Sequence, residues 1–293
     1  MRSLLVRTFC ALAVIGCVLI SAGSVYGQRA TLNIIGGKPP EYVKPKPFDN
    51  EYDAHDLSGI WFRVGGDRSH GPGRSNPPLT AAGIAEMKTH HPTRSYVPEI
   101  TPAVADPKQS NYPATRCNPK GYPAIKVDDN HDHHEIVELP NRILELWQEE
   151  GRIREIWLDG RPVPSGDNLE RIGPSWMGMS VGHWEGNTLV VEVVGLDGRA
   201  WLDSFGFPKS DNARFIERIN RPAPDTLEIE YIMYDPTYYT APWVSDIKTW
   251  KKEARNAKPV NNFGWYGLFS GLNDLICAPM NGSGDYSNSF GGN

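Results

Sequence analysis

Cysteines and long apolar runs are scarce in this chain, and acidic residues outnumber basic ones. Each of these features excludes some class of protein or site. Of the four cysteines, Cys10 and Cys17 fall in the apolar N-terminal segment, which leaves Cys117 and Cys277 for the folded part. No partner base is apparent near either of these two, so a cysteine nucleophile is not indicated. The apolar run Leu12–Ile20 is too short to span a bilayer, and no second run follows it.

The N-terminal segment has the features of a secretory signal peptide. Arg2 and Arg7 flank the start of the apolar run, and the residues before Gln28 fit a cleavage site, so we expect residues 1–27 to be removed. The alternative is a lipoprotein cut before Cys17, which would leave three apolar residues directly after the modified cysteine. The first interpretation predicts a periplasmic or secreted protein and the alternative predicts lipid anchoring at Cys17, and neither leaves an integral membrane segment after processing.

The charge balance argues against nucleic acid as a partner. The sequence has 30 basic and 35 acidic residues. Without Arg2 and Arg7, 28 basic residues remain against 35 acidic ones, which gives the mature chain a net charge of −7. Such a chain has no basic excess with which to hold a phosphate backbone or anionic lipid.

Export also bears on the remaining cysteine pair. Oxidising compartments favour disulfides, so Cys117 and Cys277 are predicted to form one that joins two distant loops. The sequence leaves open the alternative of two separately buried thiols.

The rest of the chain indicates one β domain with long loops. Its 29 glycines and 25 prolines place many residues in turns, and no internal repeat or domain linker is apparent. We expect an extended arm over residues 28–56, a β-barrel domain over 57–280 and a disordered tail over 281–293. The best helix candidate is near 80–90, where Thr80 is a suitable N-cap.

The stretch 176–195 organises the fold because it predicts a β-hairpin. Two alternating runs meet at Gly186-Asn187, a pair that suits a two-residue turn. Glu185 then faces Thr188, and this register separates the side chains into two faces. One face carries Ser180, Gly182, Trp184, Leu189, Val191 and Val193. The other carries Met179, Val181, His183, Val190, Glu192 and Val194. Both faces are largely apolar, which suits a sheet covered on both sides or closed around an interior.

Further alternating runs complete an all-β prediction. Strands are expected over residues 57–64, 134–139, 142–148, 152–158, 213–221, 226–234 and 243–252. Short turns join most of them. We therefore predict a single antiparallel meander of about eight to ten strands that closes into a barrel, with long Pro- and Gly-rich loops.

Several ordered motifs resemble a family of exported, mostly uncharacterised bacterial proteins. The matching blocks lie between about Leu57 and Cys277: DPKQSNYPATRCNPKGYP, IWLDGR, WMGMSVGHWEGNTLVV, FIERINRPAPDTLEIE and DPTYYTAPW. The resemblance implies a lipocalin-like β-barrel and brings no catalytic residues with it. The chain departs from the family pattern at His131–His134, where family members more often have aromatic and proline residues.

Two further matches to known motifs are disfavoured by their context. Residues 178–182 fit G-x-S-x-G, but a nucleophile elbow needs a strand, a sharp turn and a helix, whereas here the serine lies inside a hairpin strand. His131 and His133 would share one face of a strand, but no third or fourth metal ligand is marked. A solvated strand start is the simpler interpretation, and no metal or other cofactor is predicted.

The strand register suggests one sharper set of candidate residues. In the 134–158 meander, Trp147 lies between His134 and Arg154, and Glu145 is diagonal to both. In the central hairpin, His183 and Glu192 are likewise diagonal on one face. If these faces line a common lumen, His183, Glu192, His134 and Glu145 are candidate catalytic groups, and Trp147, Arg154 and Trp184 are candidate ligand contacts. The alternative is that the charges pair on the outer surface and Trp184 is core, because alternation cannot tell which face is inside.

Three functions fit these patterns. The favoured one is an exported barrel that binds a small, partly apolar or amphipathic molecule; the sequence leaves open whether it also acts on the molecule by cofactor-free acid–base chemistry of the isomerase, hydratase or lyase type. A carrier would use the same pocket without a tuned His/Glu pair. A scaffold would have a solid barrel and would bind a partner through its arm and loops.

Overall fold

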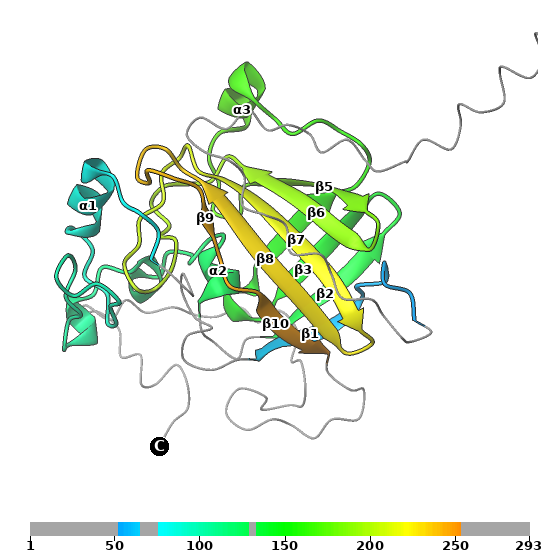
Figure 1. The fold of residues 1–293 in the computed structure, drawn as a ribbon, viewed down its shortest axis with the longest axis horizontal. Helices are drawn as coiled ribbons and strands as arrows, with labels where there is room; N and C mark the ends of the chain where they lie inside the picture. Colours follow the sequence, from blue (N-terminus) through cyan, green and yellow to red (C-terminus); the bar gives the residue numbers. More distant parts are fainter. Residues whose placement is uncertain (1–51, 65–75, 129–132, 253–293) are drawn as a thin grey trace, which may run out of the picture. The chain divides into compact units, whose positions relative to one another are not determined.

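The computed structural model describes residues 52–64, 76–128 and 133–252 (Figure 1). The signal peptide, most of the arm and the tail that the sequence predicts lie outside these residues. The strands are β1 (Gly59–Val64), β2 (His133–Leu139), β3 (Arg142–Trp147), β4 (Ile153–Trp157), β5 (Met179–Glu185), β6 (Thr188–Val194), β7 (Arg214–Ala223), β8 (Thr226–Tyr234), β9 (Trp243–Val244) and β10 (Lys248–Lys252). The α-helices are α1 (Ala81–Met87), α2 (Ala124–Val127) and α3 (Gly166–Ile172), and three short 3-10 turns lie at Pro107–Gln109, Pro113–Arg116 and Glu149–Gly151.

The strands form a closed barrel, as the sequence predicts. The order of the sheet is β10-β1-β2-β3-β4-β5-β6-β7-β8-β9, and β10 also pairs with β8. The barrel wall therefore consists of nine strands, with β9 paired to the far end of β8. None of the helices in the described ranges is long and apolar enough to cross a bilayer.

One strand pair departs from the predicted antiparallel meander. β4 and β5 are parallel, with Ile156 opposite Ser180 and Trp157 opposite Val181. A tight turn cannot join parallel neighbours, so the chain crosses back through the segment that contains α3 before it enters β5. The other strand pairs are antiparallel.

The central hairpin has the predicted register. Glu185 faces Thr188, His183 faces Val190 and Val181 faces Glu192. At the turn Gly186 has φ 59°, a conformation that glycine adopts without steric cost.

Alternation along the strands places one apolar set inside the barrel. The following inner-face side chains are at most 3 % exposed: Trp61, Ile136, Ile143, Ile156, Leu189, Val191, Val193, Phe215, Ile219, Leu227, Ile229 and Met233. On the opposite face of the hairpin Val190 and Val194 are also buried. The sheet is therefore covered on both sides here, which explains why both faces of this hairpin are apolar.

Helix α1 is shorter than predicted and is held by its own cap and by a distant loop. Thr80 accepts a hydrogen bond from the backbone N–H of Gly83 (3.0 Å), and its own N–H donates to the carbonyl of Tyr238 (2.8 Å). A Cβ at Gly83 would collide with that same carbonyl oxygen and lie 3.0 Å from Leu79 Cδ2. The helix thus approaches the 235–240 loop closely enough to require glycine.

We expect Gly83→Ala to destabilise the protein by about 1–3 kcal/mol, because the backbone of the loop must move to admit the methyl group. This loss runs against helix propensity, which favours alanine over glycine by about 1 kcal/mol. Urea unfolding measures the change. The matched control is Ala85→Gly at an exposed position of the same helix, which should lose only about 1 kcal/mol. A stabilised Gly83→Ala variant would contradict the close approach.

Candidate functional site

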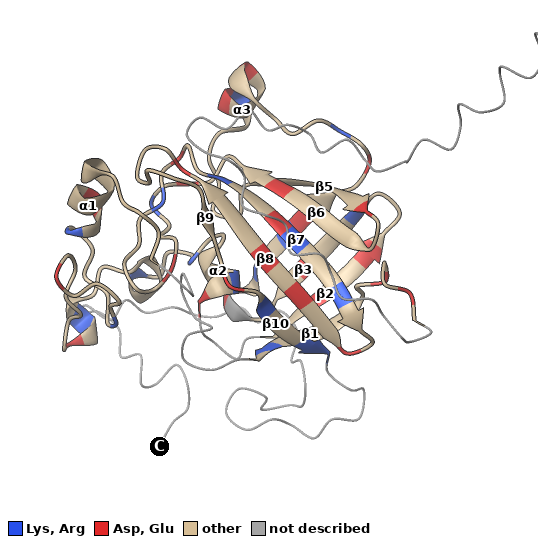
Figure 2. Ribbon diagram, in the orientation of Figure 1, with Lys and Arg blue, Asp and Glu red and all other residues tan. Residues whose placement is uncertain are grey.

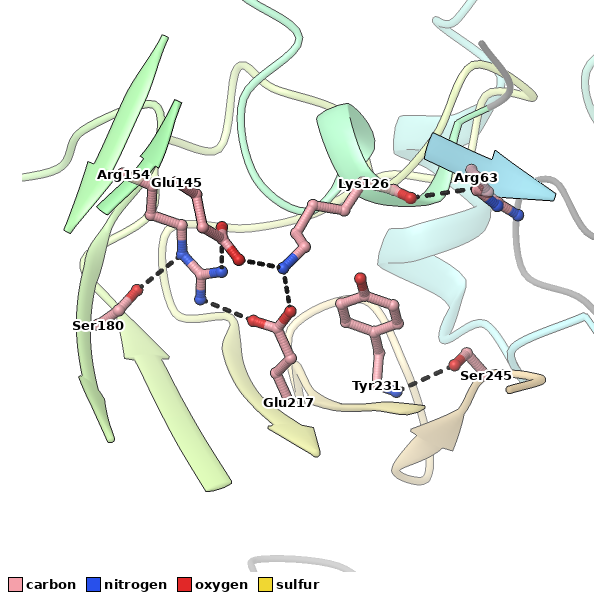
Figure 3. A network of polar contacts seen from close by, with 8 residues as sticks. All are labelled: Arg63, Lys126, Glu145, Arg154, Ser180, Glu217, Tyr231 and Ser245. Carbon is pink, nitrogen blue, oxygen red and sulfur yellow. Dashed lines mark hydrogen bonds and ion pairs between the residues drawn. The ribbon is translucent and has the colours of Figure 1, made fainter. Parts of the chain in front are cut away.

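Four ionised side chains meet in the centre of the barrel (Figure 3). Lys126 Nζ lies 2.7 Å from Glu145 Oε1 and also pairs with Glu217. Arg154 reaches Glu145 with Nη1 (2.9 Å) and Glu217 with Nη2 (2.8 Å). Its Nε donates to the hydroxyl of Ser180 at 3.0 Å. We call Lys126, Glu145, Arg154 and Glu217 the ionic cluster.

The ionic cluster is assembled by strand register and by one helix. Glu145 of β3 faces Arg154 of β4 across the sheet, and both point inward with the apolar set. Glu217 comes from β7, where it faces Val191. Lys126 belongs to α2, which lies between the 3-10 turn at Pro113–Arg116 and β2. The cluster thus joins both halves of the barrel to the loop that carries α2.

Charges in the ionic cluster alternate and cancel. Each of the four side chains is at most 1 % exposed, and charges removed from water in this way need partners of opposite sign. Burial alone would raise the pKa of Glu145, but the nearby Lys126 and Arg154 outweigh it and hold this pKa below its ordinary value. The two carboxylates likewise raise the pKa of Arg154 against the effect of burial. Glu145 therefore stays ionised and committed to its partners.

An aromatic wall stands beside the ionic cluster. His134 stacks on Trp147 with ring centroids 4.2 Å apart and meets the edge of Trp250 at 4.7 Å. Lys126 Nζ lies 5.9 Å from the centroid of Trp147. Tyr231 of β8 also lies beside the cluster, with its hydroxyl between Lys126 and Arg63 (Figure 3). The interior thus combines flat apolar surfaces with a compact charged group.

Several polar atoms of this wall, and the hydroxyl of Tyr231, are buried without a hydrogen-bond partner among the described residues. They are Nδ1 and Nε2 of His134, Nε1 of Trp147, Nε1 of Trp250 and the hydroxyl of Tyr231. Their residues are at most 2 % exposed. Since buried polar groups in folded proteins are nearly always hydrogen-bonded, such a group of donors and acceptors indicates bound water or a bound molecule.

His134 is neutral in this setting. Burial lowers the pKa of its imidazole to about 3, more than the attraction of Glu145 raises it. A neutral imidazole offers one donor and one acceptor nitrogen. His134 can therefore both donate and accept a hydrogen bond inside the barrel.

The other predicted pair, His183 and Glu192, lies on the outer face. The side chain of His183 is 58 % exposed and is 3.3 Å from Glu185, which also pairs with Arg218 at 2.8 Å. Glu192 pairs with Arg214. Figure 2 shows that acidic and basic residues occur together along β5–β8. The hypothesis that both histidine-bearing faces share one lumen is therefore wrong, and the alternative of pairing on the outer surface holds for this hairpin, because its inward face is the one that carries Ser180 and Val191.

Trp184 lies near the hairpin tip, away from the ionic cluster. Its ring stacks on His55 at 4.2 Å, and it packs against the apolar core as a half-buried side chain. These contacts fit the core alternative for Trp184.

The disulfide and metal hypotheses fall partly outside the described residues. Cys117 ends the 3-10 turn Pro113–Arg116 with φ 61°, but Cys277 lies outside the described ranges, so their disulfide stays a prediction. His131 also lies outside them. Within the described ranges no group of three or more His, Cys, Asp or Glu side chains is placed to hold a metal ion.

Sequence reasoning found half of the ionic cluster and missed the rest. Glu217 carried a signal, because it alternates with Phe215 and Ile219 in a predicted strand and so belongs to the same inward face. Lys126 carried none, because it lies in a stretch that indicates only loop. Trp250 and Tyr231 were within predicted strands, but no pattern distinguished them from other core residues.

Comparison of the chain with protein-family models, with curated proteins and with solved structures gives no match. The resemblance to exported bacterial barrels therefore stays a prediction. The functional interpretation rests on the geometry and chemistry of the barrel interior.

Proposed function

We propose that the barrel binds a small, uncharged, partly aromatic molecule in its interior, against the wall formed by His134, Trp147 and Trp250. The observation that supports this function is the group of buried polar atoms without partners on that wall. Small-molecule sites typically combine apolar and aromatic surfaces with a few such polar groups that converge on the ligand.

The chemistry of the wall sets the class of ligand. Indole N–H groups and a tyrosine hydroxyl donate hydrogen bonds, and neutral His134 adds one donor and one acceptor. The charges of the ionic cluster are already matched two to two, so they leave no net charge to attract an ion. A neutral amphipathic molecule with a flat apolar body fits these groups best.

The same features favour carriage over proton transfer. A general base must be free to take up a proton near the working pH. Glu145 is held ionised by Lys126 and Arg154, and His134 has a pKa of about 3. Side chains that are held in one charge state in this way fix a ligand in place more readily than they move a proton, so we propose a carrier without catalytic turnover.

We infer that the carrier works outside the cytoplasm. The signal-peptide features of residues 1–27 and the single remaining cysteine pair, Cys117 and Cys277, support export. The predicted disulfide fits that compartment.

Titration of the full chain with the neutral fluorophore N-phenyl-1-naphthylamine tests the proposal. We expect saturable binding, and we expect His134→Phe to weaken it at least about tenfold, because the ring stack is kept while both nitrogens are lost. Native mass spectrometry of protein purified from its own host should show a co-purified small molecule of the same class.

The matched control is His183→Phe, which makes the same change on the outer face, where the side chain is 58 % exposed. It should change the affinity less than about twofold. Equal losses in the two variants, or no binding of the fluorophore by the wild type, would overturn the proposed site and favour a solid scaffold.

A further inference from the structure

The turn 202–207 is built around a fully buried carboxyl group. The N–H of Leu202 donates to the carbonyl of Phe207 at 2.9 Å and closes the turn. Inside it Asp203 is 0 % exposed. Its Oδ1 accepts hydrogen bonds from the N–H groups of Phe205 (3.0 Å) and Phe207 (3.3 Å).

A second buried carboxyl group binds the same turn from outside. Asp128 directly follows α2 and is 6 % exposed. Its Oδ1 accepts from the N–H of Ser204 at 2.7 Å, and its Oδ2 accepts from the hydroxyl of Tyr112 at 2.5 Å. Asp128 and Asp203 therefore bind the adjacent amides of Ser204 and Phe205, which brings two acidic groups together away from water.

One oxygen of this pair has no partner among the described residues. Oδ2 of Asp203 is buried and accepts no hydrogen bond. An ionised oxygen left in this position would be costly, whereas a protonated one is neutral and can donate. Burial and the charge of Asp128 raise the pKa of Asp203 well above its ordinary value, and burial raises the pKa of Asp128.

The remaining charged groups around the pair oppose this effect without removing it. Lys120 lowers the pKa of Asp128, and Lys248 of β10 lowers that of Asp203. Arg63 of β1 donates to the backbone carbonyls of residues 126–128. The phenol of Tyr239 donates to the carbonyl of Pro208 at 2.6 Å, and burial and the charge of Asp203 raise its pKa. The phenol of Tyr112 donates to Asp128.

We propose that a proton held on Oδ2 of Asp203 keeps this buried pair singly charged, so that Asp128 and Asp203 form a latch that ties the 202–207 turn to the end of α2. Two carboxyl groups in one buried site bind a proton as a unit. When that proton leaves, two like charges face each other in a site closed to water, and the turn loosens from α2. This pH-dependent attachment of the turn is separate from the proposed ligand binding, although α2 also carries Lys126 of the ionic cluster.

The sign of the pH dependence follows from the raised pKa values. A carboxyl group whose pKa is higher in the folded state binds its proton more tightly there. Its contribution to stability is present at low pH and is lost as the pH rises from the ordinary value of 3.8 through the folded-state pKa. The latch is therefore tightest in acid and weakens as the pH rises.

Hydrogen exchange of the full chain at pH 5 and pH 8 tests the latch. Base catalysis alone speeds amide exchange between pH 5 and pH 8. In the wild type the exchange rates of the amides of residues 204–207 should rise at least about tenfold beyond that increase. In Asp203→Asn the amide oxygen still accepts from the turn and the NH2 replaces the protonated oxygen, so this additional rise should disappear. The Tm of Asp203→Asn should exceed that of the wild type by about 3 °C or more at pH 8 but not at pH 5.

Asp167→Asn, an exposed change on α3, is the control and should leave both measurements unchanged. Asp128→Asn serves as a second variant should Asp203→Asn fail to fold, and it should show the same pattern. Two results would overturn the latch. One is exchange of the turn amides in the wild type that rises only as base catalysis predicts, and the other is a Tm that falls equally at both pH values in the aspartate variants.

Discussion

Replacement of Lys126 by methionine is expected to lower the free energy of unfolding by about 3–5 kcal/mol, the usual cost of removing one partner from a buried ionic group. Methionine keeps most of the length and apolar stem of lysine. It leaves Glu145 and Glu217, both at most 1 % exposed, with Arg154 as their one remaining cation in the cluster. Urea unfolding followed by tryptophan fluorescence measures the loss.

The double variant Lys126→Met/Glu217→Gln separates lost charge balance from lost packing. In the double variant one cation, Arg154, again balances one anion, Glu145, inside the barrel. Its loss of stability should therefore be smaller than the sum of the two single losses by at least about 1 kcal/mol. Lys251→Met is the surface control, because Lys251 pairs with the exposed Asp225 at 3.2 Å. That control should cost no more than about 1 kcal/mol. Additive losses in the double variant would show that the four charges do not act as one cluster.

The sequence predicted the barrel because its local signals agree with one another. Glycine at 186 fixes the hairpin turn, and alternation then determines every pair from Glu185–Thr188 to Val181–Glu192. The same logic placed His134 beside Trp147, as observed, but it put Glu145 diagonal to Arg154, whereas the two residues face each other directly. Short-range patterns therefore predict the register where a two-residue turn fixes it, and less well across the longer 148–152 connection between β3 and β4.

Which face lies inside is not local, and there the sequence was insufficient. The sequence has equally polar patterns on two strand pairs, with Glu145 and Arg154 on one and His183 and Glu192 on the other. The first pair is buried because Lys126 and Glu217, distant in the sequence, complete its charge balance. The second has charged neighbours on its own sheet and remains at the surface. The parallel pairing of β4 and β5 escaped prediction for a similar reason, since the crossover through α3 leaves no turn signal.

Acid is expected to destabilise the protein through His134. Burial lowers the pKa of this imidazole from 6.5 to about 3 in the folded state. A histidine with a depressed pKa stabilises the fold fully above its unfolded-state pKa, and this stability is lost as the pH falls from 6.5 toward 3. One pKa unit corresponds to about 1.4 kcal/mol, so His134 alone should cost about 3 kcal/mol by pH 4. Buried His90, with a pKa lowered to about 4, adds a loss of the same sign.

Urea unfolding at pH 7, 5.5 and 4 in the wild type and in His134→Phe isolates this contribution. Asp128 and Asp203 change stability in the opposite direction over this range, and His90 changes it in the same direction. Because both proteins keep these groups, they cancel from the difference. The variant should lose about 3 kcal/mol less than the wild type between pH 7 and pH 4, whereas His183→Phe, with its exposed ring, should follow the wild type. Parallel pH profiles for His134→Phe and the wild type would mean that His134 accepts a proton inside the barrel without penalty, and its neutral role against the ligand would then be wrong.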